Sequence, residues 1–165
     1  MMITLPGFMG SGKTTVGKVL ADFLGCPFMD LDDLIVKKAG KSIPEIFAQD
    51  GEPAFRELEA RLLRQTVEKY AENTAVLALG GGAVTTPASA ALLHEKTVCI
   101  YLRATLDTLL ERLAGETAGR PLADDTLAAR LAAREPIYEE TAHVVIDTDG
   151  LSPDEVADEI IISAL

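Results

Sequence analysis

The sequence predicts one α/β domain built on a five-stranded parallel sheet, and three observations lead to this prediction. The chain has 165 residues, and at roughly 150 residues per domain this length favours a single domain. Short apolar runs alternate with helical stretches from end to end, without a Ser/Pro-rich linker or an internal repeat. The apolar runs show little polar alternation, as expected for parallel strands that helices cover on both faces.

Strands and early helices have recognisable boundaries. The expected strands are Met2–Leu5, Pro27–Met29, Ala75–Leu79, Val98–Leu102 and His143–Ile146. The first two expected helices, Thr14–Leu24 and Asp32–Ala39, each stop before a glycine, which readily ends a helix in the left-handed conformation. Ser42 is the expected N-cap of the next helix, with Glu45 in the capping-box position.

The later helices are also marked by their end residues. The longest spans Glu52–Tyr70, with Pro53 in its first turn and one apolar stripe facing the core. It is followed by Pro87–His94, Leu106–Leu113, Thr126–Arg134 and a last helix that Ser152 caps and Pro153 begins. Residues 114–125 contain two glycines, a proline and few apolar side chains, so we expect a mobile loop there.

The composition excludes several classes of protein. Fifteen Lys and Arg residues against 26 Asp and Glu give a net charge of −11, which repels nucleic acid and anionic membranes. No apolar run approaches the ~20 residues of a bilayer-spanning helix, and no basic segment precedes an apolar one near residue 1, so we expect a cytoplasmic protein. Cys26 and Cys99 have no metal-ligand spacing, and we expect both to be buried, reduced thiols.

Residues Gly7–Thr14, GFMGSGKT, match the phosphate-loop pattern in full. A strand precedes the loop and a helix follows it, so backbone N–H groups and a helix N-terminus would point at a phosphate. Lys13 would reach the β- and γ-phosphates of a nucleotide, and Thr14 would offer a hydroxyl to Mg²⁺. The structural alternative is a Gly-rich turn without a ligand.

Two acids follow the second strand, at the sheet edge where ligands bind in open α/β folds. Of Asp30 and Asp32, one would hold Mg²⁺, and the other would accept a hydrogen bond from a hydroxyl that attacks phosphorus. The alternative is that these acids and Asp33 only cap the next helix, a role that suits Asp33 best.

Two further motifs allow more than one interpretation. Gly80–Gly82 follows the third strand, where backbone groups would approach a ligand or form a plain tight turn. Asp147–Gly150 has the spacing of a GTPase switch motif, but it follows the fifth strand and no guanine-reading Asn-Lys-x-Asp sequence accompanies it. We interpret it as a turn.

Taken together, the motifs resemble those of shikimate kinases over nearly the whole chain. The matching segments are Gly7–Thr14, Asp30–Asp32, Ser42–Phe47, Gly51–Arg56, Gly80–Val84, Arg120–Leu122 and Arg134–Tyr138. The resemblance implies one phosphate-loop kinase domain over residues 1–165 with a three-layer α/β/α fold and strand order 2-3-1-4-5. It also implies a lid at about 114–125 and substrate-binding helices between about 32 and 62.

The resemblance further implies that ATP phosphorylates the 3-hydroxyl of shikimate, with Mg²⁺, in aromatic amino-acid biosynthesis. The implied catalytic residues are Lys13, Asp32 and Arg120, and the implied metal ligands are Thr14 and Asp30. The implied shikimate contacts are Asp32, Arg56, Gly80, Gly81, Gly82 and Arg134. The implied ATP contacts are Gly10, Ser11, Gly12, Lys13, Thr14, Thr15, Arg112 and Arg120, with Asp147 and Thr148 near the adenine.

Individual roles also follow from the resemblance. Asp32 would orient or deprotonate the attacking hydroxyl, while Arg56 and Arg134 would clamp the shikimate carboxylate. Arg120 would swing onto the phosphates when the lid closes. Phe47 and Phe55 would either wall the pocket or belong to the core.

Two rival functions remain open from the residues alone. A kinase for gluconate or a nucleoside monophosphate would share the fold, and a nucleotide-binding regulator would share the phosphate loop. The combination of Asp32, Arg56, Arg134 and Gly80–Gly82 favours a compact carboxylate that bears hydroxyls. We expect ATP and shikimate as partners, no nucleic acid or membrane, and a monomer.

Overall fold

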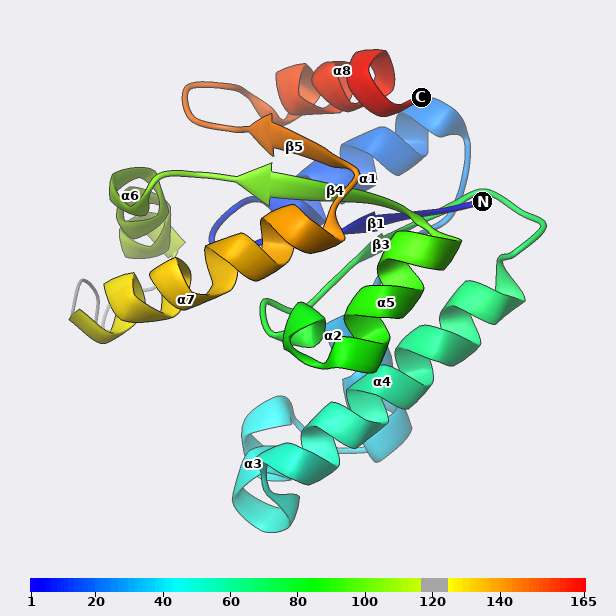
Figure 1. Ribbon diagram of the computed structural model, residues 1–165, viewed down its shortest axis with the longest axis vertical. Helices are drawn as coiled ribbons and strands as arrows, with labels where there is room; N and C mark the ends of the chain where they lie inside the picture. The colour runs from blue at the N-terminus through cyan, green and yellow to red at the C-terminus, as the bar shows by residue number, and fades with distance from the viewer. Residues whose placement is uncertain (117–124) are drawn as a thin grey trace.

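The computed structural model describes residues 1–116 and 125–165 (Figure 1). Its strands are β1 (Met2–Leu5), β2 (Phe28–Asp30), β3 (Ala75–Ala78), β4 (Val98–Arg103) and β5 (Val144–Asp147). Its helices are α1 (Lys13–Leu24), α2 (Leu31–Ala39), α3 (Ile43–Asp50), α4 (Glu52–Lys69), the 3₁₀ helix η1 (Ala83–Thr85), α5 (Pro87–Lys96), α6 (Leu106–Glu116), α7 (Asp125–Thr141) and α8 (Pro153–Ala164). Most of the predicted lid, and Arg120 with it, lies outside the described residues.

The five strands form one parallel sheet in the order β2-β3-β1-β4-β5, which confirms the predicted order. The register aligns Leu5 of β1 and Asp30 of β2 with Ala78 of β3, and Arg103 of β4 with Asp147 of β5. The carboxyl ends of the strands therefore form one edge of the sheet. The phosphate loop, the acids after β2 and the three glycines after β3 all start from this edge.

Helices cover both faces of the sheet, so the predicted three layers are confirmed (Figure 1). Alternate residues of each strand face opposite layers: Cys99 and Tyr101 of β4 pack with α2, α4, α5 and α7, whereas Ile100 and Leu102 pack with α1 and α8. Both faces are apolar, which explains why the strands read as continuous hydrophobic runs.

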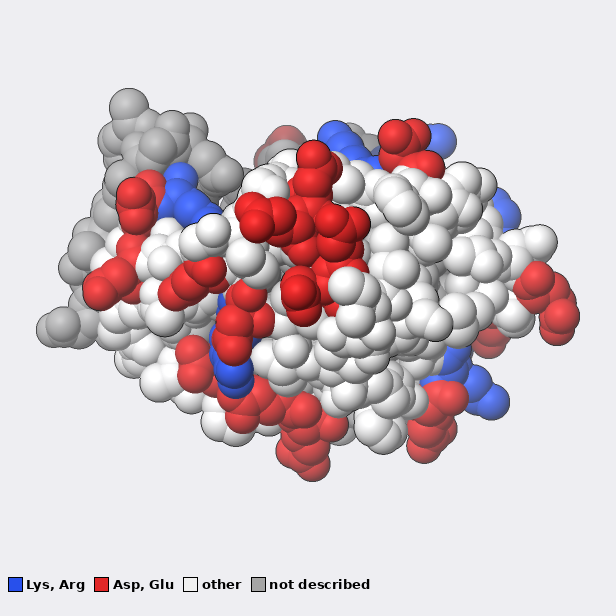
Figure 2. Space-filling view, turned by 90° about the horizontal axis from the view of Figure 1, so that it is seen from above, with Lys and Arg blue, Asp and Glu red and all other residues white. Residues whose placement is uncertain are grey.

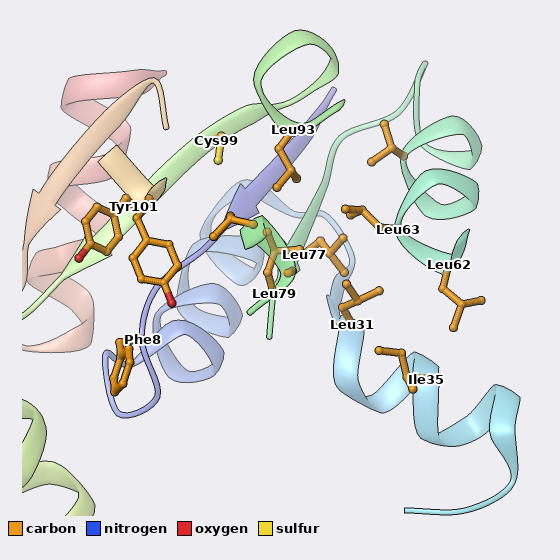
Figure 3. Close-up of a cluster of buried hydrophobic side chains, with 14 of the residues drawn as sticks. Phe8, Leu31, Ile35, Leu62, Leu63, Leu77, Leu79, Leu93, Cys99 and Tyr101 are labelled. Atoms are coloured by element: carbon orange, nitrogen blue, oxygen red, sulfur yellow. The ribbon is translucent and has the colours of Figure 1, made fainter. Parts of the chain in front are cut away.

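Figure 3 shows part of the larger of the two apolar clusters, which packs helices α2 and α4 against the sheet. Leu77 and Leu79 of the β3 segment face Leu63 of α4 and Leu31 of α2, all with 2% exposure or less. Burying a leucine side chain stabilises the fold by roughly 1.5–3 kcal/mol. Because Leu31 lies directly between Asp30 and Asp32, its burial also fixes where these two acids emerge.

Helix α7 departs from its predicted boundary. We expected this helix to end at Arg134, but it continues to Thr141 with Pro136 inside it. Proline removes one backbone donor and usually interrupts a helix. Here Tyr138 is fully buried and packs on Tyr101, with ring centroids 4.8 Å apart, so tertiary packing outweighs the lost hydrogen bond.

Smaller differences concern strand ends and one cysteine. β4 and β5 each extend one residue further than expected, to Arg103 and Asp147, because these side chains pair with each other across the strands. Cys99 is buried as predicted, but Cys26 is only half-buried. In the part of the chain described, no helix is both long and apolar enough to cross a membrane.

Candidate active site

The phosphate loop leads from β1 into the first turn of α1. Gly10 and Gly12 adopt left-handed backbone conformations, with φ of 82° and 91°, which residues with a side chain rarely adopt. Gly12 is the N-cap of α1, so the unpaired N–H groups of the helix N-terminus open into the loop. The Ser11 hydroxyl is buried and has no hydrogen-bond partner within the described residues. This loop is therefore suited to an anion such as phosphate.

Lys13 folds back over the phosphate loop. Its Nζ donates to the carbonyl oxygen of Gly7 and lies 3.5 Å from the carbonyl oxygen of Phe8. Desolvation lowers the pKa of Lys13 to about 8, and the carboxylates of Asp32 and Asp30 act in the opposite direction. A phosphate bound in the loop would add negative charge beside this amine and favour its protonated form.

Asp30 ends β2 and uses both of its carboxylate oxygens. Oδ1 accepts a hydrogen bond from the backbone N–H of Asp32 at 2.9 Å and so caps α2. Oδ2 accepts from the Thr14 hydroxyl at 3.1 Å. Both side chains offer hard oxygen ligands of the kind that Mg²⁺ takes, so the pair fits the predicted metal site. The described residues contain no group of three or more His, Cys, Asp or Glu side chains suited to a metal, so nucleotide and water oxygens would complete the shell.

Asp32 lies in the first turn of α2, beside Lys13. Burial raises the pKa of its carboxyl most, the nearby Asp30 carboxylate raises it further, and Lys13 opposes both effects. A carboxylate with a raised pKa accepts protons more readily than an ordinary aspartate. Asp32 therefore has the position and the chemistry to bind a hydroxyl group near a nucleotide phosphate.

The three glycines after β3 bring three charged side chains together. A Cβ atom on Gly80 would lie 2.8 Å from Oδ1 of Asp32, and one on Gly81 would lie 3.2 Å from Nη1 of Arg134. A Cβ atom on Gly82 would lie 2.7 Å from Nη1 of Arg56. Each glycine thus leaves room for one of the side chains that the sequence singled out.

Two elements supply the arginines of this group. Arg56 lies in the first turns of α4, and its Nη1 donates to Oε1 of Glu59 at 2.8 Å. Arg134 comes from α7, and its guanidinium carbon lies 5.8 Å from the centre of the Phe8 ring in the phosphate loop. Two guanidinium groups facing one glycine segment form a natural receptor for a carboxylate, because each can donate two parallel hydrogen bonds.

A pocket adjoins the phosphate loop next to Arg112. It is a cavity of about 200 Å³ lined by Gly10, Ser11, Gly12, Thr15, Val16, Arg112, Thr148, Leu151, Pro153 and Val156. Arg112 donates to the carbonyl oxygen of Gly10 at 3.2 Å and to that of Thr148 at 3.3 Å. The pocket combines apolar walls with backbone groups, as a flat aromatic base requires.

Several predicted residues lie elsewhere or act differently. The carboxylate of Asp147 pairs with Arg103 at 2.6 Å and 3.0 Å, while Thr148, which the resemblance places with it near the adenine, lines this cavity. Helix capping, the alternative role that we considered for these acids and that suited Asp33 best, is performed by Asp30. Phe55 is buried in the core, whereas Phe47 is 38% exposed and stacks on it with ring centroids 4.8 Å apart. The core role is therefore confirmed for Phe55, and the pocket role stays a prediction for Phe47.

Sequence reasoning missed Glu59. This side chain is 2% exposed, and its Oε2 has no hydrogen-bond partner in the part of the chain described. Burial raises its pKa, although Arg56 opposes the shift. Its position three residues after Arg56 on a helix was the available signal, since side chains at this spacing share a face. Burial of a carboxylate among apolar neighbours cannot be read from that spacing.

The fold and this site define a class of protein. A parallel sheet in the order β2-β3-β1-β4-β5, with a phosphate loop after β1 and an acid at the end of β2, is the framework of a phosphate-loop kinase. The side chains of Asp32, Arg56 and Arg134, gathered at the three glycines near Lys13, are suited to a small anionic acceptor rather than to a macromolecule.

Comparisons with known proteins specify this class further. The family model for shikimate kinase (SKI) matches residues 9–164. The shikimate kinase of Enterococcus faecalis is 43% identical over 164 residues, covering 96% of this chain and 95% of its own. The protein belongs to the shikimate kinase family.

Solved structures agree with this assignment. A shikimate kinase from Acinetobacter baumannii, solved in complex with shikimate, matches with a TM-score of 0.85 at 34% identity and covers 97% of this chain and 90% of its own. A gluconokinase from Sinorhizobium meliloti matches with a TM-score of only 0.61 at 19% identity, covering 98% of this chain and 89% of its own. The gluconokinase thus shares the fold alone.

Proposed function

We propose that this protein transfers the γ-phosphoryl group of ATP to the 3-hydroxyl of shikimate, giving shikimate 3-phosphate and ADP in aromatic amino-acid biosynthesis. One observation carries the proposal. Gly80, Gly81 and Gly82 each make room for one of the side chains of Asp32, Arg134 and Arg56, immediately beside Lys13. Membership of the shikimate kinase family supports the same substrate pair.

On the nucleotide side, the phosphates would lie on the loop Gly7–Thr14, with the ammonium group of Lys13 against them. Ser11 and the N-terminus of α1 would add hydrogen-bond donors. The adenine would enter the cavity between Arg112 and Pro153. When bound at Thr14 and Asp30, Mg²⁺ would neutralise phosphate charge and make phosphorus easier to attack.

On the acceptor side, Arg56 and Arg134 would hold the shikimate carboxylate from two directions. This clamp would place a ring hydroxyl at Asp32, whose carboxylate would orient it and accept its proton as the bond to phosphorus forms. The glycine segment would let the ring approach the main chain closely, because it presents no side chain of its own.

The proposal also includes residues outside the described part of the chain. Arg120, within a lid at about 114–125, would cover the phosphates once both substrates are bound. We propose that residues 1–165 act as one domain, and that the helices between about 32 and 62 hold the acceptor. We also propose that the protein acts as a monomer. The free thiols of Cys26 and Cys99 suit the reducing cytoplasm.

The deciding experiment measures ADP release with MgATP alone and with shikimate, gluconate or AMP added. We expect release that depends on shikimate, and a loss of at least about a hundredfold in kcat for Asp32→Asn with ATP affinity retained. If gluconate or AMP stimulates ADP release instead, shikimate is not the acceptor, and only the proposed nucleotide site stands. ATP binding without turnover on any acceptor would indicate a nucleotide-binding regulator.

A further inference from the structure

A buried tyrosine outside the predicted site contacts the glycine segment. Tyr138 of α7 is fully buried, and its hydroxyl donates a hydrogen bond to the main-chain oxygen of Gly81. Its ring tilts against Tyr101 of β4, with centroids 4.8 Å apart, and Figure 3 shows Tyr101 in the core near Phe8 of the phosphate loop. The tyrosine thus connects the core of the sheet with the proposed acceptor pocket.

Two side chains of one helix lie against Gly81. Tyr138 follows Arg134 by four residues, so the two side chains lie on the same face of α7. A Cβ atom on Gly81 would lie 3.2 Å from Nη1 of Arg134 and 3.6 Å from the hydroxyl oxygen of Tyr138. The placement of α7 therefore sets the position of both the arginine and the glycine main chain.

The hydrogen bond also determines how the Gly81–Gly82 peptide is turned. This peptide is trans and planar, so the Gly82 N–H points away from the side on which the Gly81 oxygen meets Tyr138. Consecutive glycines have much conformational freedom, which a segment that is not held beforehand loses on binding substrate. The main-chain oxygens of Gly80 and Gly82 accept hydrogen bonds from Ala83 and Thr85, and the bond from Tyr138 adds the oxygen of Gly81 between them. A fixed peptide plane removes much of that entropy cost in advance.

The hydroxyl is suited to this task because it stays protonated. Burial raises the pKa of Tyr138 to about 12, and the positive charge of Arg134 only partly offsets the shift. A protonated hydroxyl can donate to the oxygen of Gly81, and Arg134 Nη1 lies beside the same glycine. The hydroxyl therefore contacts the same backbone segment as the carboxylate-binding arginine.

We infer that Tyr138 is a positioning residue for the acceptor, whose hydroxyl holds Gly80–Gly82 at the spacing from Arg56 and Arg134 that a bound carboxylate requires. This inference rests on the proposed function. A positioning role differs from an ordinary core role because loss of the hydroxyl weakens the binding of shikimate and leaves the binding of ATP unchanged.

The test uses Tyr138→Phe, which keeps the ring in the core and removes only the hydroxyl. A lost neutral hydrogen bond of about 1 kcal/mol corresponds to a rise of roughly fivefold in KM and Kd for shikimate. We expect the KM for ATP to stay within about twofold. Tyr101→Phe is the matched control, because it alters the other ring of the pair and leaves the bond between Tyr138 and Gly81 in place.

The wild-type protein and both variants are compared by steady-state kinetics, calorimetric titration with shikimate and thermal unfolding. Equal changes for both substrates, an unchanged KM for shikimate, or the same loss in Tyr101→Phe would overturn the inference. A Tyr138→Phe protein that does not fold would also overturn it, since the hydroxyl would then serve the whole fold. Failure of the wild-type protein to bind shikimate would instead overturn the proposed function.

Discussion

Asp32 sits where the protein opposes its ionisation. Burial and the neighbouring Asp30 carboxylate raise its pKa, and only Lys13 and Arg56 among the main influences lower it. The fold therefore loses stability to keep a carboxylate beside the phosphate loop. Such local costs are typical of sites that must bind a reacting group.

Asp32→Asn should be more stable than the wild-type protein while losing activity. The raised pKa means that wild-type stability falls as the pH rises from about 3.8 through the pKa of the folded protein. At pH 7 we expect the unfolding midpoint of the variant to be higher by about 2–4 °C, the effect of roughly 1 kcal/mol in a domain of this length. Thermal unfolding at pH 7 and below pH 3.8 checks this, and a gain that persists in acid would contradict it.

Lys13 should make nucleotide affinity depend on pH. Its pKa is about 8 in the free protein, and a bound phosphate would raise it, so affinity is greatest below pH 8 and declines above it. We expect ADP to bind about tenfold more weakly at pH 9 than at pH 7. Calorimetric titration measures this decline. Lys13→Met is the control, and an equal decline in that variant would assign it to another group.

At the scale of elements, helices α3 and α8 begin with the same capping interaction. Ser42 and Glu45 form a capping box at the start of α3, and Ser152 and Glu155 form one at the start of α8. Helix α3 places Phe47 on Phe55, next to Arg56, whereas α8 covers the opposite face of the sheet. The same local interaction therefore serves the proposed acceptor pocket in one case and the core in the other.

This pair provides a matched test. Ser42→Ala and Ser152→Ala should each lower the free energy of unfolding by about 1 kcal/mol, because each removes one capping hydrogen bond. Only Ser42→Ala should also raise the KM for shikimate, since loosening α3 disturbs the side chains around Arg56. Denaturant unfolding and steady-state kinetics on both variants measure these effects. A raised KM in Ser152→Ala would show that loss of stability alone accounts for the change.

The whole molecule carries a negative net charge, whereas positively charged side chains gather at the site. The net charge is −11, yet Lys13, Arg56 and Arg134 converge on the glycine and phosphate-loop segments. Figure 2 shows acidic side chains gathered on the face seen from above, where α8 lies in Figure 1. Local fields in a cleft act over short distances and differ from the far field of the protein. Small anions would thus find a positive site on a body that repels polyanions.

This charge pattern predicts selective behaviour toward anions. The protein should pass through a heparin column at about 0.1 M salt, because the Debye length of ~10 Å lets the acidic surface repel an extended polyanion. ADP should still bind under the same conditions, which calorimetry can verify. Retention on heparin that duplex DNA displaces would contradict the expectation of no nucleic-acid partner.

Part of the site was predictable because it is encoded locally. The phosphate loop, the acid after β2 and the triple glycine are short motifs, and each depends on backbone conformations or spacing within a few residues. Arg56 and Arg134 were singled out through the family resemblance, and the structure brings them with Asp32 to Gly80–Gly82. The roles of Glu59 and Tyr138 were not predictable, because each depends on burial by elements distant in the chain.

By itself, the sequence determined the fold class, the strands and the phosphate loop, since apolar runs, glycine stops and capping residues act between near neighbours. The strand order followed from the family resemblance. Only the tertiary structure decided that α7 continues through Pro136 and that one face of α7 contacts Gly81. The physical reason is that packing energy belongs to contacts between distant segments, and it can outweigh the local preference of a single residue.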